Sequence, residues 1–530
     1  MAKRFIHYEI KNGIEYASIY TPQRIDGKKV NNPEYLGRVV DKANGIYKNR
    51  TRGLFAYNLE KGFTNIPIDI NYDSAHTTIQ EEKLILDFGD AYCLYSIMQS
   101  NDLFGIIQSL MPGQEDTLMS LVGYKLLASG ANRYAEDWWS GSYTRILFPN
   151  AKLRSQRISE FYKELGDETI QRDFFKKYLC MICKGKSVGI LIDSTGLPND
   201  INFPLTAVHT HNGITSNETR LILVIDRKNG MPLFFRYNAG NIVDVTTLRA
   251  TISELDAYNI NIDFVIVDAG YCSENNIVSL YGDGDINKKI PFLTRLASNW
   301  KLYKQLISEN INDLEHSKHM LWLRDRLLSV KRVEVDLFGN NGYAYVSLDH
   351  QRRHDEIQKY LKTALHDKNI SDAEKDEAIK TKGVFILISS EKIEINEIMP
   401  LYYTRQSVEQ VFDLSKNNVD LLPLRVHDEE AFRGHLMLSF IASIVYLIFN
   451  QKLNDTLYNA EGAFMILRNQ KCKVFVDRIL PKEVNKKMND IYKKLNISPP
   501  PLSLMCGKKY LRELRIIQSY GEDMTTAGRF

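Results

Sequence analysis

Two aspartates stand at the ends of apolar runs, Asp193 in ILIDSTG and Asp268 in VIVDAGY. Each run is typical of a strand buried on both faces, and open α/β sheets bind ligands in the crevice at the carboxyl ends of such strands. If the two strands are neighbours, the like charges raise a pKa unless a cation lies between them, and Mg²⁺ prefers such oxygen ligands. One aspartate in this position more often caps a turn, but two in matched positions indicate a metal site.

A third carboxylate and three side chains suited to phosphate occur in the stretch YYTRQSVEQVFDLSK. Pro400, just before it, suits a first helical position, so we expect a helix that begins there. Tyr402, Arg405, Glu409 and Lys416 are separated by three, four and seven residues and would form a single stripe along that helix. Most polar helix faces only meet water. The two aspartates, however, give Glu409 partners for a metal ion.

The elements that must position these residues follow from the periodicity of the chain. We expect a mixed α/β core, because from Ser187 the pattern runs strand, strand, strand, helix, strand, helix, strand. An alternating hairpin and charged helical segments interrupt this core before Pro400. The predicted segments are a β-rich N-terminal region (1–82), a helical region (83–185), the first part of the core (186–296), the insertion (297–398), the second part of the core (399–452) and a basic helical C-terminal region (453–530).

The composition is that of a soluble globular protein, with 44% apolar and 25% charged residues. The net charge of +3 does not by itself indicate a nucleic-acid partner, but residues 451–530 carry 15 Lys and Arg against 8 Asp and Glu. Such a segment binds phosphate or is a solvated helical surface, and both interpretations stay open. The apolar run at 436–449 is shorter than the ~18–20 residues of a membrane span, so we expect a buried helix and a cytoplasmic protein.

Smaller motifs are expected to be structural. Cys180 and Cys183 form a CxxC pair without the second ligand pair of a zinc site, so we expect buried thiols. Asp226 precedes a tight turn and is expected to form it, and Asp244 is expected to cap a helix.

The motifs together resemble those of the DDE transposases of bacterial insertion sequences, in the group with the signature Y-x2-R-x3-E-x6-K. The chain matches that signature at Tyr402, Arg405, Glu409 and Lys416 with every spacing kept, and LIDSTGL and VIVDAGY match the group's two aspartate motifs. RVHDEEAFRGHLMLSFIA resembles the helix that follows the glutamate. The resemblance covers roughly residues 187–450 and extends more loosely to YLGRVVDKANGIYKNR near the N-terminus.

The resemblance implies a ribonuclease H-like mixed-sheet core interrupted by a β-rich insertion, with an N-terminal β-then-helical DNA-binding region and a helical C-terminal tail. Within it, residues 83–185 are the candidate for DNA-end binding, and residues 453–530 are the candidate for dimerisation or DNA contacts. It also implies two Mg²⁺ ions, or Mn²⁺ in their place, held about 4 Å apart by Asp193, Asp268 and Glu409 as catalytic residues. Water would cleave the phosphodiester at each element end, and the freed 3′-hydroxyl would attack target DNA. The implied partners are the terminal inverted repeats, target DNA and a second copy of the chain, with no membrane.

DNA contacts are implied for four side chains. The Tyr, Arg and Lys of the signature bind phosphates near the cleaved end in such enzymes, which implies that role for Tyr402, Arg405 and Lys416. An aromatic residue of the insertion stacks on a flipped base, and Trp322 is the candidate, with Trp300 a weaker one. The other interpretation of Trp322 is a core residue of a β-rich domain.

Three other classes of protein were weighed. A metal-dependent nuclease without strand transfer would share the same core and is the closest alternative. A domesticated DNA-binding relative would usually have lost one acid, and all three are present. A phosphotransferase of the haloacid dehalogenase type wants a second aspartate two residues after the first, where this chain has Thr195.

Overall fold

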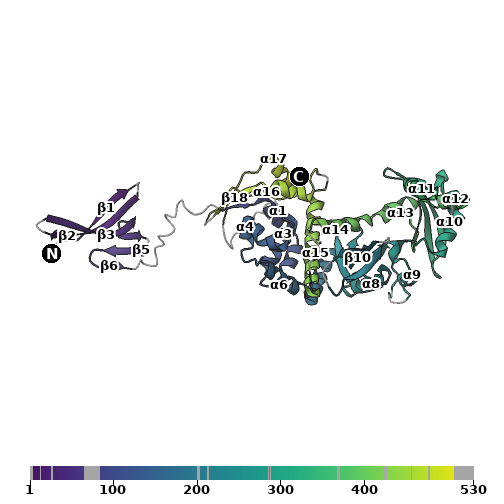
Figure 1. Ribbon diagram of the computed structural model, residues 1–530, viewed down its shortest axis with the longest axis horizontal. Coiled ribbons are helices and arrows are strands. Elements are labelled where there is room, and N and C mark those ends of the chain that lie inside the picture. Colours follow the sequence, from purple (N-terminus) through teal and green to yellow (C-terminus); the bar gives the residue numbers. More distant parts are fainter. Residues whose placement is uncertain are drawn as a thin grey trace, which may run out of the picture. The chain divides into compact units, whose positions relative to one another are not determined.

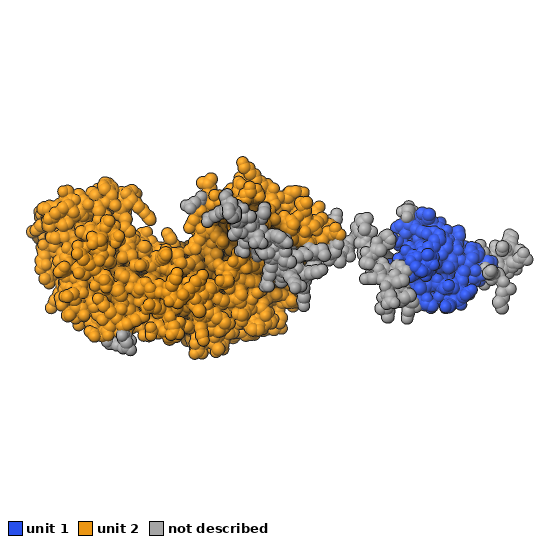
Figure 2. All heavy atoms as spheres, turned by 180° about the vertical axis from the view of Figure 1, so that it is seen from behind, with its two compact units in different colours: residues 1–83 blue, residues 84–530 orange. Residues whose placement is uncertain are grey.

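The computed structural model describes residues 4–11, 14–25, 28–49, 51–64, 84–199, 203–211, 214–283, 286, 288–366, 370–419, 421–422, 424, 426–454, 456–475 and 478–505. The chain forms two compact units, residues 1–83 and residues 84–530 (Figure 2). The β-rich region predicted at 1–82 corresponds to the first unit. The other five predicted segments all lie in the second unit.

The first unit is a six-stranded antiparallel sheet whose strands follow one another in chain order. Its core lies on one face of the sheet and consists of Ala17, Ile19, Leu36, Tyr47, Phe55 and Tyr57. Gly37 has a φ of +119°, and a Cβ there would overlap the Lys48 carbonyl oxygen, so only glycine fits this bulge between neighbouring strands. The strands are β1 (Phe5–Lys11), β2 (Ile14–Ile25), β3 (Lys28–Asp41), β4 (Ile46–Asn49), β5 (Gly53–Asn58) and β6 (Gly62–Thr64).

The second unit begins with a short strand and the predicted helical region, which packs against the long helix α15 (Glu429–Lys452). Gly166 and Gly434 allow this close approach, because a Cβ on Gly166 would overlap the Glu430 carbonyl oxygen and one on Gly434 would overlap that of Tyr162. The elements are β7 (Leu84–Asp87), α1 (Gly89–Gln99), α2 (Leu103–Gln108), α3 (Glu115–Leu127), α4 (Ala135–Gly141), α5 (Thr144–Leu147), α6 (Ser155–Leu165) and α7 (Glu168–Cys183).

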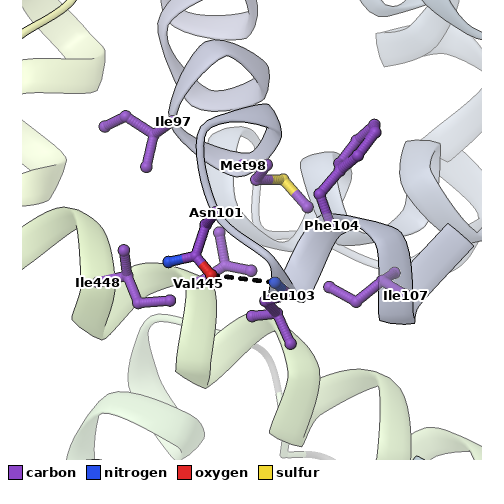
Figure 3. A pocket seen from close by; sticks show the side chains of 8 residues that line it. All are labelled: Ile97, Met98, Asn101, Leu103, Phe104, Ile107, Val445 and Ile448. Carbon is purple, nitrogen blue, oxygen red and sulfur yellow. Dashed lines mark hydrogen bonds between the residues drawn. The ribbon is translucent and has the colours of Figure 1, made fainter. Parts of the chain in front are cut away.

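Helix α15 lies between this helical region and the strands of the second unit (Figure 1). A small apolar pocket of about 10 Å³ remains where it meets α1 and α2, and at its edge Asn101 accepts a hydrogen bond of 3.0 Å from the Leu103 amide (Figure 3). That volume is at the lower limit for a single water molecule, so the pocket is a packing gap. Among the described residues α15 has the length and composition of a membrane span, and 83% of that window is buried inside the unit, as predicted for a core helix.

A mixed ten-stranded sheet forms the centre of the second unit, with the order β11-β10-β8-β12-β13-β17-β16-β15-β14 and β9 paired to β10. The pairs β8–β12 and β12–β13 are parallel, and the others are antiparallel. The predicted mixed α/β class is therefore confirmed. The core strands are β8 (Val188–Pro198), β9 (Ala207–His211), β10 (Ile214–Asp226), β11 (Pro232–Ala239), β12 (Ile262–Val267) and β13 (Phe292–Arg295), with α8 (Leu248–Ala257) and α9 (Glu274–Leu280) between them.

The insertion contributes strands to this same sheet rather than forming a sheet of its own. The predicted hairpin is present as β15 and β16, and β17 joins it to the core by pairing with both β16 and β13. Helices α10 and α11 pack on the hairpin. The elements are α10 (Lys301–Leu314), β14 (Met320–Leu323), β15 (Arg326–Asp336), β16 (Asn341–Asp349), α11 (His350–Ala364), α12 (Asp372–Lys380) and β17 (Val384–Ser389).

The helix predicted to begin at Pro400 is instead two helices, α13 (Ile395–Tyr403) and α14 (Gln406–Asn417), with Pro400 inside the first. The break lies at Thr404, whose hydroxyl donates to the Leu401 carbonyl at 2.6 Å, and short-range backbone bonds replace the helical pattern there. Helix α13 packs on β14 and β15, whereas α14 packs on β8, β10 and α15 (Figure 1). The two helices thus connect the insertion to the core.

The prediction of a purely helical C-terminal region was wrong. Residues 471–474 form β18, which pairs antiparallel with β7, more than 380 residues earlier in the chain. Short strands of this kind carry little periodic signal and depend on a distant partner. The elements are α16 (Ala460–Arg468), β18 (Lys471–Val474), β19 (Arg478–Pro481), α17 (Lys486–Lys494) and β20 (Leu504–Met505), and the strands form a four-stranded sheet in the order β20-β19-β18-β7.

Candidate active site

The two aspartates lie side by side on neighbouring parallel strands. Ile192 of β8 pairs with Val267 of β12, so Asp193 and Asp268 occupy equivalent positions one residue further on. Only β12 ends there. Strand β8 continues to Pro198 beside β10, so Asp193 is inside a strand and not at its end as the sequence suggested.

The guanidinium of Arg405 lies among all three acids of the predicted site. Its Nη1 is 2.9 Å from Asp193 Oδ2 and 3.6 Å from Asp268 Oδ2, and its Nη2 is 3.1 Å from Glu409 Oε1. Arg405 directly precedes α14 and Glu409 is in its first turn, so this helix carries both side chains to the edge of the sheet. Acids that lie 75 and 141 residues apart in the chain therefore share one cation.

The other two residues of the signature also contact this edge of the sheet. The Tyr402 hydroxyl donates to Asp268 Oδ1 at 3.1 Å, and Lys416 Nζ donates to Thr195 Oγ1 at 2.7 Å. Although the predicted single helix is broken, the four signature residues still face β8 and the end of β12. The helix break changes how the residues are held but not which strands they meet.

Burial and neighbouring charges shift the ionisation of these groups. Burial raises the pKa of Asp193 to about 6; Arg405 opposes this, whereas Asp268 and Asp244 add to it. Burial disfavours the charged form of Arg405, but Asp268 and Asp193 outweigh it and raise the pKa of the guanidinium. Burial, followed by Asp268, also raises the pKa of Tyr402, so its hydroxyl stays a hydrogen-bond donor at neutral pH.

A second charged pair lies beside the site, at Ser194, the residue after Asp193, and sequence analysis did not predict it. Arg220 of β10 donates through Nη2 to both carboxylate oxygens of Asp244, at 2.8 and 2.9 Å, and to Ser194 Oγ at 2.5 Å. Asp244 was expected to cap a helix. It instead forms this ion pair, and Val243 precedes the short 3₁₀ turn at 244–246. A pair 24 residues apart on different elements has no spacing signature that sequence analysis could detect.

The donor set fits a hard divalent cation, and the Arg405 guanidinium lies among its members. Carboxylate oxygens are what Mg²⁺ or Mn²⁺ prefers. Within the described ranges, however, no three His, Cys, Asp or Glu side chains converge closely enough to hold a metal ion. Arg405 lies between the acids instead. Metal binding by Asp193, Asp268 and Glu409 therefore requires the guanidinium to move away.

The remaining sequence predictions had mixed outcomes. Trp322 is 70% exposed on the edge strand β14, so its interpretation as a core residue was wrong, whereas Trp300 is partly buried against Phe338, with ring centroids 5.5 Å apart. Asp226 forms its predicted turn by accepting from the Lys228 amide at 2.7 Å. The expected burial of the CxxC thiols was wrong: Cys180 is exposed and Cys183 is half-buried, because both lie on the last turn of α7.

Comparison with known proteins assigns a class to this central region. Residues 184–445 match the family model described as the transposase DDE domain. The match begins just before β8 and ends within α15, so it includes both aspartates, the insertion and the whole signature. The central part of the chain is therefore similar to a transposase domain of the DDE type.

Two solved structures with a weaker likeness are also transposases. A piggyBac transposase synaptic complex with hairpin DNA is 11% identical, with 82% of this chain and 85% of that chain covered and a TM-score of 0.39. A Drosophila P element transposase strand transfer complex is 10% identical, with 78% and 80% covered and a TM-score of 0.20. The curated proteins gave no match to the chain.

Proposed function

We propose that this chain is a metal-dependent DNA transposase of an insertion sequence, with a ribonuclease H-like core and Asp193, Asp268 and Glu409 as its catalytic acids. The observation that carries the proposal is the convergence of these three acids, from β8, β12 and α14, on one guanidinium. Acids that only stabilised the fold would have no reason to meet at the open edge of a transposase domain. The family match over residues 184–445 supports the class of reaction.

The acids would hold divalent ions that activate the attacking oxygen and stabilise the leaving oxygen of a phosphodiester. Mg²⁺ is the expected ion, and Mn²⁺ would substitute for it. Asp193 must be ionised to act as a ligand, and its pKa of about 6 allows this at neutral pH. Tyr402 keeps the Asp268 carboxylate oriented through the 3.1 Å hydrogen bond to Oδ1.

Arg405 has two successive roles in this proposal. Without metal or DNA it neutralises the three carboxylates, which would otherwise repel one another. Once it leaves them, its planar fork of N–H donors suits a phosphate of the DNA end. Lys416, held at the same edge by Thr195, would contact the backbone as a point charge. The exposed Trp322 is available to stack on an unpaired base.

The substrates follow from this chemistry. Water cleaves the phosphodiester at each end of the element, and the freed 3′-hydroxyl then attacks target DNA at the same acids, so no covalent protein–DNA intermediate is needed. We expect the terminal inverted repeats of the element as the recognised DNA and a homodimer as the assembly that holds both ends together.

The test is a cleavage and joining assay on DNA that bears the element's own terminal repeats, with Mg²⁺ present. Asp193→Ala, Asp268→Ala and Glu409→Ala are each expected to lower the rate by about 10³-fold or more, because each removes a ligand at the reacting atoms. Asp226→Ala is the matched control. It removes a carboxylate at the end of β10, in the same sheet, whose hydrogen bond forms a turn, and it is expected to retain activity.

Two outcomes would contradict the proposal. Activity retained in any of the three triad variants would mean that the acids are not catalytic. Cleavage by the unchanged protein without joined products would favour the alternative, a nuclease without strand transfer.

A further inference from the structure

The positive charge of the chain is concentrated outside the transposase domain, and one of its locations is the N-terminal sheet. Residues 1–64 carry 12 Lys and Arg against 6 Asp and Glu, whereas residues 65–530 carry 56 against 59. The helical region at 84–185, the earlier candidate for DNA-end binding, carries 11 against 12. A net excess of six positive charges on so small a unit is the electrostatic footprint of a phosphate-binding surface.

Two of these cations, Arg38 and Lys48, lie on the face opposite the core, and Glu9 of β1 lies in the same row beside Tyr16. Tyr16 of β2 pairs with Arg38 of β3, and Arg38 pairs with Lys48 of β4, so the three side chains form one row across the sheet. Arg38 and Lys48 are both exposed. The core residues Ala17 and Ile19 alternate with this row and point to the other face.

Aromatic rings continue the same face beside the basic row. Phe5 and Tyr20 are register partners and stack with centroids 5.7 Å apart, and Tyr35 lies 6.4 Å from Tyr16. Phe5 is 43% exposed and Tyr35 is 59% exposed, although both belong to a sheet that buries aromatic rings on its other side. Exposed rings interleaved with cations are costly to leave in water and suit contact with nucleotides.

The backbone of the sheet favours duplex over single-stranded DNA. Strands β2 and β3 pair with each other as far as Ile25 and Lys28. The described part of β1, by contrast, pairs with β2 only as far as Tyr20. Within the described residues the two strands continue beyond that point as a two-stranded ribbon. A two-stranded antiparallel ribbon has the width that the major groove of B-DNA admits.

We propose that this face, made of Phe5, Tyr16, Tyr20, Tyr35, Arg38 and Lys48, binds double-stranded DNA. The cations contact phosphates on either side of the groove, and the rings contact sugars and base edges between them. The proposal goes beyond the proposed function, since it concerns a surface in the other unit and needs no metal or catalytic acid. It also transfers the role of DNA-end binding from the helical region to the N-terminal sheet.

The test measures binding of the full-length chain to a short fluorescent DNA duplex by anisotropy, in EDTA and over a series of salt concentrations. The face variant Arg38→Gln/Lys48→Gln is compared with Lys42→Gln/Lys61→Gln, which removes the same charge from positions outside the row. Lys42 pairs with Glu15 at 2.5 Å and lies over the Tyr8 ring on the core side, and Lys61 is in the turn before β6. All four side chains are exposed, so both variants are expected to keep their circular dichroism spectra.

The face variant is expected to bind the duplex about tenfold more weakly at low salt, and the slope of log K against log salt is expected to fall by about 2, because each lost phosphate contact contributes about 0.9. The control is expected to keep most of the original slope. Tyr35→Ala is expected to weaken binding several-fold with an unchanged slope, because it removes contact area but no charge.

The proposal would be overturned if the slope of log K against log salt fell equally in the face and control variants. Binding would then depend on the total charge of the unit and not on this face. Tighter binding to the corresponding single strand than to the duplex would also overturn it. Because EDTA removes metal and no cleavage is measured, failure here is distinguishable from failure of the catalytic assignment, which the triad variants test separately.

Discussion

The two large sheets of this protein treat their charges in opposite ways. At the ten-stranded sheet two cations are mostly buried and paired with acids. Arg405, which precedes α14, has 19% of its side chain exposed and contacts three acids, and Arg220 of β10 has 13% exposed and pairs with Asp244. In the six-stranded sheet Arg38 and Lys48 are exposed on the face opposite the core.

The difference separates charges needed for the structure from charges available to a ligand. Charged groups taken out of water must be compensated, and removal of one partner leaves the other uncompensated. Exposed charges contribute little to stability and are free to meet a polyanion. At the edge of the ten-stranded sheet the three acids already pair with Arg405, which a divalent cation would have to displace in the proposed function. In the N-terminal sheet Arg38 and Lys48 lie at the surface instead.

Replacement of Arg405 tests the internal compensation most directly, and we expect the largest effect there. Arg405→Ala removes the cation that lies among the acids, so Mn²⁺ is expected to bind the DNA-free protein about tenfold more tightly in a calorimetric titration at pH 8.5. That pH keeps Asp193 ionised after the stabilising charge is lost, since its pKa is already about 6 in the unchanged protein. The same variant is expected to lose about 10²-fold in cleavage rate, because the phosphate contact is lost as well.

Arg405→Lys is the control for this prediction. It keeps the positive charge but loses the planar fork, so Mn²⁺ affinity is expected to lie between those of the unchanged protein and the alanine variant. Unchanged or weaker Mn²⁺ binding by Arg405→Ala would show that the guanidinium does not compete with the metal. The different pairing of cations at the two sheets would then not explain how each sheet binds its ligand.

The Arg220–Asp244 pair tests the structural side of the comparison. Asp244→Asn leaves the mostly buried Arg220 with only its longer ion pair, 3.4 Å to Glu218, and we expect a loss of roughly 2 to 3 kcal/mol in the free energy of unfolding of the second unit. Lys42→Gln breaks the Lys42–Glu15 pair in the first unit, whose side chains are 54% and 31% exposed, and is expected to cost less than about 0.5 kcal/mol. Hydrogen exchange on β10 and β2 reports the two units separately. Equal losses in both would remove the distinction.

The sequence predicted the parts of the site that depend on local pattern. Two apolar runs ending in aspartate indicated two buried strands but left their adjacency open, and in the structure β8 and β12 are parallel neighbours. The spacing of the signature placed Glu409 near them because helical geometry repeats over short distances. The break at Thr404 was missed, since a side-chain bond to the preceding turn leaves no mark in the apolar pattern.

What could not be predicted depends on partners that are distant in the chain. Arg405 was expected to bind a DNA phosphate. Nothing in its spacing indicated that it would form ion pairs with the three acids. Strand β18 depends on β7 for its pairing, and Asp244 depends on Arg220. The sheet face around Arg38 became visible only when the strand register placed cations and rings on one side.

The last effect we predict concerns a buried neutral group in the second unit. His435 is 5% exposed on α15, and its Nε2 lies 2.9 Å from the Leu421 carbonyl oxygen. Burial, and then the nearby charge of Lys125, lower the pKa of His435 to about 3. Between the usual pKa of about 6.5 and this value, the unfolded chain binds a proton that the folded chain does not. His435 therefore removes stability as the pH falls through that range.

We expect His435→Gln, which keeps a donor for the Leu421 carbonyl, to reduce the acid dependence of the second unit's unfolding by up to about 1.4 kcal/mol per pH unit between pH 6 and 4. The measurement is the midpoint temperature of thermal unfolding as a function of pH. The slopes of the two proteins are compared, because the substitution also changes the overall stability. His7→Gln in the first unit is the control and is expected to leave that slope unchanged, because His7 lies on the exposed face of the other sheet. A slope that His435→Gln does not alter would mean that the imidazole is protonated in the folded chain, and buried charge in the second unit would then not be fully compensated.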